Sequence, residues 1–214
     1  MAMGGAGLGT ALDEYVLGLA RGRRVCFVPT ASSESPDYVI RFYDAFAAKA
    51  EATHLLFFPY PPEDLRGFVL AQDVIYVGGG NTANMLAVWR VHGMDRVLRE
   101  AWESGVVLCG SSAGMICWFE AGVTDSFGPQ LEGMRDGLGF VPGSACPHYD
   151  GEELRRPRYR ELVDGGFPAG WAADDGVGLH FVGTELAEAV TAIPGKRAYR
   201  VEPASETPLD ARPL

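Results

Sequence analysis

A serine lies in a setting that could make it a nucleophile. Residues 110–114 read Gly-Ser-Ser-Ala-Gly, after an apolar run and before a helix-like stretch. This matches a G-x-S-x-G nucleophile elbow, in which small flanking residues permit a tight turn from strand to helix. Ser112 would then project from the carboxyl end of the strand, and the amides at the helix N-terminus would face developing negative charge. The same letters also fit a glycine-rich turn without chemistry.

A glycine loop that could hold an oxyanion precedes this serine. Residues 77–82 read Val-Gly-Gly-Gly-Asn-Thr, again between strand and helix patterns. Acyl transfer creates an oxyanion that preset N–H donors must stabilise. A glycine of this loop could supply one donor and Ala113 the other. An anion-binding turn or a merely tight turn is the alternative. No G-x-G-x-x-G sequence runs through the loop and no Walker sequence occurs in the chain, which disfavours nucleotide binding.

A serine nucleophile needs a base to remove its proton, and the chain has four histidines. His54 opens a strand pattern, His92 lies at a helix end, and His180 falls in an alternating strand pattern, where structural roles are common. His148 follows a short run and comes just before a helix pattern. His148 is therefore the best candidate for the base.

The carboxylate that would orient the histidine is not fixed by spacing. Asp125 lies in a loop after the elbow, whereas Asp174 and Asp175 form a second acidic loop. Asp150 is too close in sequence to His148 to orient its ring easily. Each of these carboxylates could instead be a solvated turn residue. The residues alone leave Asp125 and the 174–175 pair as alternatives.

Composition narrows the remaining classes of function. The formal net charge is −10, which disfavours a nucleic-acid partner. No HExxH, paired CxxC or EF-hand spacing occurs, so we expect no metal and no cofactor. Cys26 and Cys109 fall in apolar runs, which is typical of buried thiols in a reducing compartment. With no signal-peptide pattern and no apolar run of membrane-spanning length, we expect a cytoplasmic protein without a membrane partner.

The elements that must position these residues alternate along the chain. Apolar runs predict buried strands at 25–29, 54–58, 74–77 and 106–109. Helices are predicted at 36–46, 81–89 and 113–119. Continuous apolar strands separated by amphipathic helices are typical of a parallel sheet covered on both faces.

The composition of the chain changes after residue 120, where glycine and proline become frequent. Segments 177–182 and 198–201 indicate strands, interpreted as an antiparallel extension of the sheet. The length of 214 residues, with 47% hydrophobic content, fits a single domain over 1–214. The segment 203–214 contains three prolines and little apolar content, so we expect a loosely held tail.

Four motifs in this order resemble peptidase E, the aspartyl dipeptidase family of serine peptidases. They are VGGGN at 77–81, GSSAG at 110–114, TDS at 124–126 and PHY at 147–149. This family is related in fold to class I glutamine amidotransferases and to cyanophycinase, and the resemblance runs from about Gly4 to Glu202. It implies a three-layer α/β sandwich with a mostly parallel central sheet and antiparallel strands near the C-terminus. It also implies a triad of Ser112, His148 and Asp125, although some relatives use a later acid, which keeps Asp174 and Asp175 as alternatives. The oxyanion donors that it implies are Gly79 or Gly80 together with Ala113.

The resemblance further implies a small peptide substrate, because characterised members cleave dipeptides with an N-terminal aspartate. An arginine after the histidine helps them hold the aspartyl side chain. Arg155 is the matching position, with one extra residue between Glu and Arg. Rival functions are a cyanophycinase-like or other acidic-peptide hydrolase, and a non-catalytic module that binds a small acidic ligand. Family members also tend to form homodimers. The family usually has an apolar strand before the Gly4-Gly5 loop, where this chain begins, so a strand is expected to be missing or the start to be misplaced.

Overall fold

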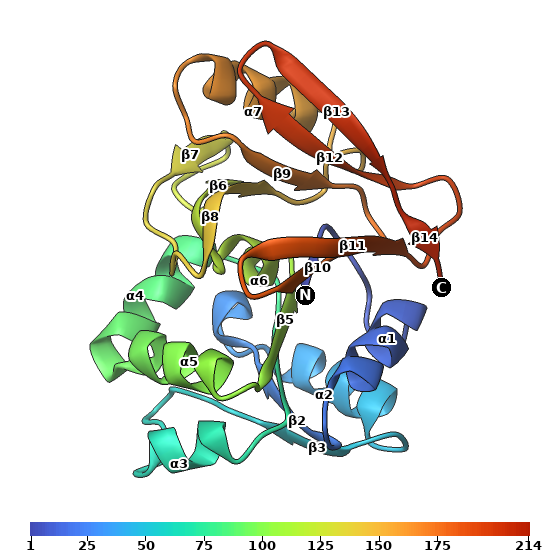
Figure 1. Cartoon of the computed structure of the whole chain (residues 1–214). Coiled ribbons are helices and arrows are strands. Elements are labelled where there is room, and N and C mark those ends of the chain that lie inside the picture. Colours follow the sequence, from blue (N-terminus) through green and yellow to red (C-terminus); the bar gives the residue numbers. More distant parts are fainter.

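Two β-sheets form the framework of the protein (Figure 1). The structure is a computed structural model that describes residues 1–214. The larger sheet has eight strands, in the spatial order β14 (Arg212–Pro213), β11 (Glu185–Thr191), β10 (Val177–Val182), β1 (Ala2–Met3), β5 (Val107–Ser111), β4 (Val74–Val77), β2 (Arg24–Val28) and β3 (Glu51–His54). The smaller sheet has six, in the order β13 (Ser205–Asp210), β12 (Arg197–Glu202), β9 (Gly170–Ala173), β8 (Val141–Cys146), β6 (Phe119–Thr124) and β7 (Glu132–Met134).

Seven α-helices accompany the sheets. They are α1 (Ala11–Leu19), α2 (Pro36–Phe46), α3 (Leu65–Leu70), α4 (Thr82–His92), α5 (Met94–Glu103), α6 (Ala113–Ile116) and α7 (Arg155–Asp164), with a short 3-10 turn at Thr30–Ser32. No helix is both long enough and apolar enough to cross a membrane.

The larger sheet has a parallel core and an antiparallel margin. Strands β1, β5, β4, β2 and β3 pair in parallel, while β10 pairs antiparallel with β1 and β11 pairs antiparallel with β10. This confirms the expected α/β fold with a mostly parallel central sheet. The strand that we expected to be missing is present as the two residues of β1, with Met3 opposite Ser111. The carboxyl ends of β1, β4 and β5 therefore meet at one edge of the sheet, where open α/β sheets bind ligands.

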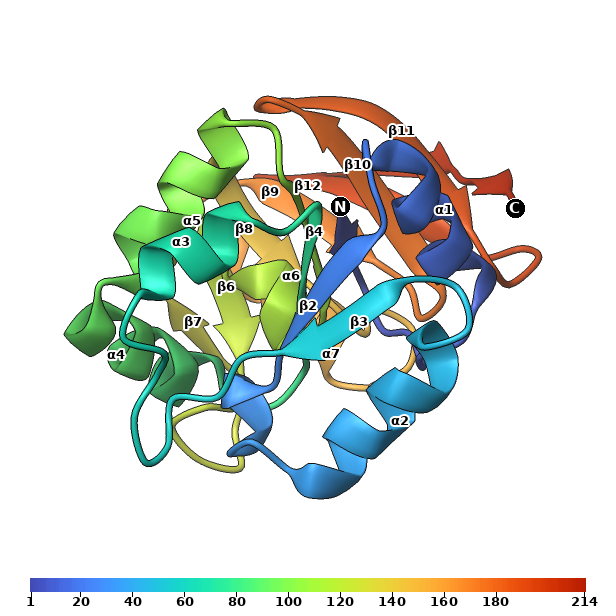
Figure 2. The same ribbon diagram turned by 90° about the horizontal axis from the view of Figure 1, so that it is seen from below.

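Helices cover both faces of the larger sheet because its strands are apolar on both sides. On β2, Val25 and Phe27 pack into a cluster with residues of α1 and α2. The alternate residues Cys26 and Val28 pack into the other cluster, with residues of α3, α4 and α5. Figure 2 shows the two groups of helices on opposite sides of β2. A strand buried on both faces has no polar alternation, which explains its continuous apolar sequence.

The smaller sheet was not expected as a separate element. Its β12 contains the segment 198–201, which we had interpreted as an extension of the larger sheet, and that interpretation is wrong. The sheet packs with α7 around an apolar cluster that includes Tyr149, Tyr159 and Val201. In Figure 1 it lies above the larger sheet, with α7 on its outer side. After residue 120 the chain therefore passes between the two sheets more than once.

Several predicted boundaries differ from the structure. The strand predicted at 54–58 ends at His54, although Leu55 and Phe57 are buried, so the apolar run marked burial rather than a strand. The helix predicted at 113–119 ends at Ile116, because the chain turns at once into β6. The sequence patterns also missed α1, α3 and α5.

The tail from residue 203 is not loose. Strand β13 pairs with β12 along its whole length, from Ser205 opposite Glu202 to Asp210 opposite Arg197. Strand β14 pairs with β11. Most side chains of this segment are exposed, so backbone hydrogen bonds hold it. Composition reports apolar burial and could not reveal a strand fixed by backbone pairing.

Candidate active site

Ser112 occupies a strained turn between β5 and α6. Its backbone angles are φ 59° and ψ −112°, a region that residues with a Cβ rarely adopt. Glycines on both sides make the turn feasible. A Cβ at Gly110 would overlap the carbonyl oxygens of Gly114 and Val77, and a Cβ at Gly114 would overlap the Val77 backbone. This is the geometry of a nucleophile elbow, with the serine at the N-terminus of a helix.

The glycine loop after β4 lies beside the serine. A Cβ built on Gly79 would stand 3.7 Å from Ser112 Oγ, so the loop backbone approaches the hydroxyl closely. The Gly79 N–H donates to the Tyr38 hydroxyl at 3.3 Å, while the Gly80 N–H makes no hydrogen bond. Gly80 has φ +136°, which favours glycine. Ala113 is the first residue of α6, so its N–H has no acceptor within the helix.

His148 lies in the loop that follows β8. Its backbone is also in the left-handed region, at φ 54°. The His148 N–H donates to the Gly4 carbonyl at 3.2 Å, and the Ser112 N–H donates to the Met3 carbonyl, also at 3.2 Å. Both residues are thus anchored to consecutive carbonyls at the end of β1. This shared anchor places the predicted nucleophile and the predicted base at the same end of β1, and no hydrogen bond joins their side chains.

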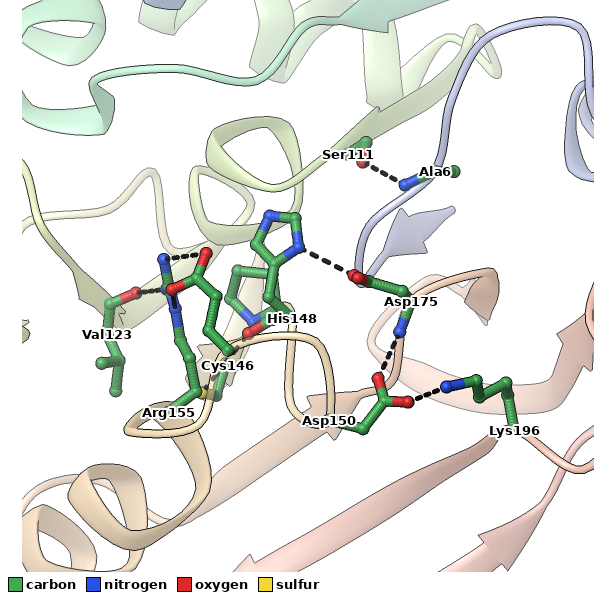
Figure 3. A network of polar contacts seen from close by, with 11 residues as sticks. Ala6, Ser111, Val123, Cys146, His148, Asp150, Arg155, Asp175 and Lys196 are labelled. Carbon is green, nitrogen blue, oxygen red and sulfur yellow. Dashed lines mark hydrogen bonds and ion pairs between the residues drawn. The ribbon is translucent and has the colours of Figure 1, made fainter.

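The carboxylate that contacts the histidine ring is Asp175. His148 Nδ1 and Asp175 Oδ1 are 2.7 Å apart, and Figure 3 shows the carboxylate reaching the ring from the turn after β9. Nε2, the nitrogen that a serine would use, makes no hydrogen bond. Our choice of Asp125 as the partner is therefore corrected to Asp175, which the spacing had left as an alternative. The acidic turn connects β9 of the smaller sheet to β10 of the larger one, and this crossing points Asp175 at the ring.

The segment around Asp125 serves the glycine loop instead. Asp125 is exposed and its carboxylate makes no hydrogen bond. Its neighbour Ser126 accepts a hydrogen bond from Ala83 N–H through Oγ at 3.2 Å, and its carbonyl accepts one from Asn81 Nδ2 at 2.9 Å. Thr124 Oγ1 bonds to Ser126 Oγ at 2.7 Å. The motif thus holds the start of α4, directly after the glycine loop.

Arg155 is buried, with only 3% of its surface exposed. Its Nε donates to the Glu152 carboxylate at 2.7 Å, and its Nη1 donates to the Val123 carbonyl at 3.0 Å. The guanidinium predicted to bind substrate is therefore engaged within the protein. It connects α7 to the end of β6, one residue before Thr124.

The other histidines have different partners. His54 Nδ1 lies 2.8 Å from the Tyr43 hydroxyl, and His180 Nδ1 lies 2.7 Å from the Tyr15 hydroxyl. His92 lies beside the ring of Phe57. Only His148 is within ion-pair distance of a carboxylate. Among the four histidines, the one that the sequence favoured is therefore the one whose ring is paired with a carboxylate.

Two supporting groups were missed from the sequence. Tyr38, from α2, places its hydroxyl on the Gly79 amide, and burial raises its pKa, so the hydroxyl stays protonated. Ser111 Oγ accepts from the Ala6 N–H at 3.0 Å and thereby fixes the glycine-rich loop after β1 (Figure 3). The sequence signal for Ser111 was its place in the GSSAG motif, where it is the first of the two serines. Nothing in the sequence marks Tyr38.

No group of three or more His, Cys, Asp and Glu side chains is placed to hold a metal ion. The four cysteines are buried and free.

The fold and the elbow define a class of α/β protein with a mostly parallel central sheet and a serine at a sharp turn from strand to helix. A crystal structure of a peptidase from an acI-B1 Actinobacterium superposes with a TM-score of 0.69 at 19% identity, covering 98% of this chain and 95% of that one. At this identity the match supports the fold alone.

Sequence comparison identifies the family. The model of peptidase family S51 matches residues 3–189, and the chain belongs to this family. The uncharacterized peptidase YgaJ of Bacillus subtilis (strain 168) is 50% identical over 210 residues, which cover 94% of this chain and 90% of that protein. Peptidase E of Streptomyces coelicolor (strain ATCC BAA-471 / A3(2) / M145) is 29% identical over 172 residues, covering 72% of this chain and 66% of that protein. The chain is a serine-type peptidase, and the resemblance to peptidase E is confirmed.

Proposed function

We propose that the protein hydrolyses short peptides through a relay of Ser112, His148 and Asp175 and a covalent acyl-enzyme. The observation that carries the proposal is the common anchor of base and nucleophile. The amides of His148 and Ser112 bond to consecutive carbonyls of β1, while Asp175 fixes the far side of the ring at 2.7 Å. Such an arrangement is recognised by geometry and role rather than by position in the chain.

The chemistry follows from these positions. His148 Nε2 takes the hydroxyl proton of Ser112, and Oγ attacks the peptide carbonyl carbon. The N–H groups of Gly80 and Ala113 stabilise the oxyanion, since Gly80 has a free amide and Ala113 begins a helix. Asp175 keeps the proton on Nδ1 and stabilises the imidazolium. His148 then protonates the leaving amine, and water hydrolyses the acyl-enzyme by the same route.

The proposed substrates are dipeptides with an N-terminal aspartate, as the resemblance to peptidase E implies. Because Arg155 is engaged with Glu152, another cation has to meet the substrate carboxylates. Arg41 makes no ion pair and lies over the ring of Tyr38, whose hydroxyl binds the glycine loop. Arg41 and Asp44 line a hollow of about 630 Å³ beside the loop at residues 6–9. A hollow with one cation and one anion suits a small zwitterion.

The proposal includes a reducing cytoplasmic setting. Its support is that all four thiols are free and buried.

Replacing the nucleophile tests the relay. Ser112→Ala should lower kcat by at least about 10⁴-fold while the melting temperature stays near that of the wild type. A fluorophosphonate probe should label the wild type and fail to label Ser112→Ala. Ser205→Ala, at an exposed serine of β13, is the matched control and should keep both labelling and turnover. Undiminished hydrolysis by Ser112→Ala would exclude the proposed mechanism.

A substrate panel tests the specificity. Kinetics on Asp-X, Glu-X, Ala-X and N-blocked dipeptides should show preference for Asp-X and rejection of blocked termini. Arg41→Gln should raise KM for Asp-X about tenfold or more and change KM for Ala-X less, since the lost contact is a charged one. Equal losses on both substrates would remove Arg41 from the specificity site and leave the relay untouched.

A further inference from the structure

The Asp175 carboxylate is held in a narrow space between two glycines. A Cβ at Gly5 would overlap Asp175 Oδ1 and the His148 ring, and a Cβ at Gly151 would overlap Asp175 Oδ2. Neither glycine has a positive φ, so close approach rather than backbone conformation favours glycine at both positions. The carboxylate therefore has little freedom once the backbone at residue 175 is fixed.

A second carboxylate fixes that backbone. Asp150 Oδ1 accepts a hydrogen bond from the Asp175 N–H at 2.9 Å, and Asp150 Oδ2 forms an ion pair with Lys196. Figure 3 shows the sequence of contacts from Lys196 through Asp150 to Asp175 and then to His148. Asp150 makes no contact with the His148 ring. The loop that contains His148 therefore also holds Asp175, through the hydrogen bond from the Asp175 amide to Asp150.

The contacts join three separate segments. His148 and Asp150 belong to the loop after β8, Asp175 belongs to the turn between β9 and β10, and Lys196 belongs to the turn before β12. The neighbouring Asp174 is buried and accepts from the Arg197 N–H at 2.9 Å, which ties the second segment to the third. The relative position of acid and base thus depends on contacts among all three.

The charges of this group favour the pairing at neutral pH. Burial acts to raise the pKa of Asp150, but hydrogen bonds from Lys196 and from the Asp175 amide outweigh it, and the pKa is lowered. The hydrogen bond to Asp150 raises the pKa of Lys196. The negative charges of Asp174 and Asp175 also raise the pKa of Lys196, which thus stands among three carboxylates and pairs with Asp150.

We propose that Asp150 and Lys196 form a clamp that positions Asp175 against His148. The inference rests on the proposed function, in which Asp175 orients the base. Asp150 and Lys196 bond to neither Ser112 nor the His148 ring, so the proposal treats both as positioning residues. A displacement of a catalytic group by about 1 Å can cost on the order of 10²-fold in rate, which sets the size of the expected effect.

The test compares graded variants of the full-length protein. Asp150→Ala should lower kcat about ten- to a hundredfold and leave KM within about twofold, because the substrate contacts remain. Asp150→Asn keeps an oxygen that can accept from the Asp175 amide but loses the ion pair with Lys196, so its kcat should lie between those of Asp150→Ala and the wild type. Asp136→Ala removes a carboxylate from an exposed ion pair with Arg90 and should behave as wild type.

A spectroscopic signal makes the clamp measurable without turnover. The proton between His148 Nδ1 and Asp175 should give a downfield ¹H NMR resonance, assigned by its loss in His148→Gln. Asp150→Ala should shift or broaden this resonance, while Asp136→Ala should not. If turnover proves independent of Ser112, the proposed function fails, and the resonance still decides whether the clamp exists. An unchanged kcat and an unchanged resonance in Asp150→Ala would overturn the clamp.

If Asp150→Ala does not fold, variants of Lys196 test the clamp instead. Lys196→Met removes the cation that holds Asp150, and Lys196→Arg restores a cation at the same position. The clamp predicts a lower kcat for Lys196→Met and recovery in Lys196→Arg. Equal turnover in Lys196→Met and the wild type would count against it.

Discussion

The nucleophile and the acid–base pair are held by different means. Ser112 owes its position to a turn of a few residues, in which Gly110 and Gly114 allow close packing against β4. His148 and Asp175 stand on loops that cross between two sheets, and their positions depend on contacts far apart in sequence. Ser112 thus depends on a short turn packed between neighbouring parallel strands, whereas His148 and Asp175 depend on contacts among loops that are far apart in sequence. Substitutions around His148 and Asp175 should therefore spread their effects over longer distances.

The largest expected effect separates the two carboxylates that the sequence could not rank. Asp175→Asn should lower kcat by about 10⁴-fold, because an amide favours the wrong tautomer of the ring. Asp125→Asn should stay within a few-fold of the wild type, since that side chain is exposed and makes no hydrogen bond. Steady-state kinetics of both variants on one dipeptide show which substitution lowers kcat more. A larger loss in Asp125→Asn would reverse our assignment.

A smaller effect concerns Arg155, which connects α7 to the end of β6. Arg155→Met should lower the free energy of unfolding by about 2 kcal/mol, because the buried Val123 carbonyl loses its donor. Arg66→Met breaks only an exposed pair with Glu100 and should leave the free energy of unfolding close to that of the wild type. Urea denaturation measures both. A rise in KM for Asp-X without loss of stability would return Arg155 to the substrate site.

The smallest effect tests the C-terminal hairpin. Glu206 on β13 accepts hydrogen bonds from Tyr149 and Arg156, next to His148. Burial acts to raise its pKa, but these two partners outweigh it, and the pKa falls below the ordinary 4.5. A lowered folded pKa stabilises the fold above pH 4.5, and this stabilisation is lost as pH falls through the lowered value.

Glu206→Gln should therefore destabilise the protein by about 1 kcal/mol at neutral pH, and the difference from wild type should shrink in acid. Thermal or urea unfolding at pH 7 and below pH 4 measures the two limits. A difference that grows on acidification would contradict the assigned role of Glu206.

The sequence predicted the parts of the molecule that obey local rules. The elbow at Ser112 and the buried strand β4 follow from small residues and from apolar runs, and the parallel core was confirmed. The acid could not be predicted, because Asp175 reaches the ring only through the crossing from β9 to β10. The strand β13 escaped notice because backbone pairing, rather than apolar side chains, holds it. Asp150 was excluded as the orienting carboxylate because it lies so close to His148 in sequence. That closeness lets it accept the hydrogen bond from the Asp175 amide.

The order of the segments along the chain has a consequence for synthesis. The nucleophile and its glycine loop are complete once residue 114 has been made, whereas Asp175, Lys196 and Glu206 come much later. Chains are made from the N-terminus, so the acid that orients the base is absent while most of the protein is being translated. On the proposed mechanism, an unfinished polypeptide would thus contain the serine turn but not the complete relay. Such a peptidase would gain its activity only when its own translation is nearly finished.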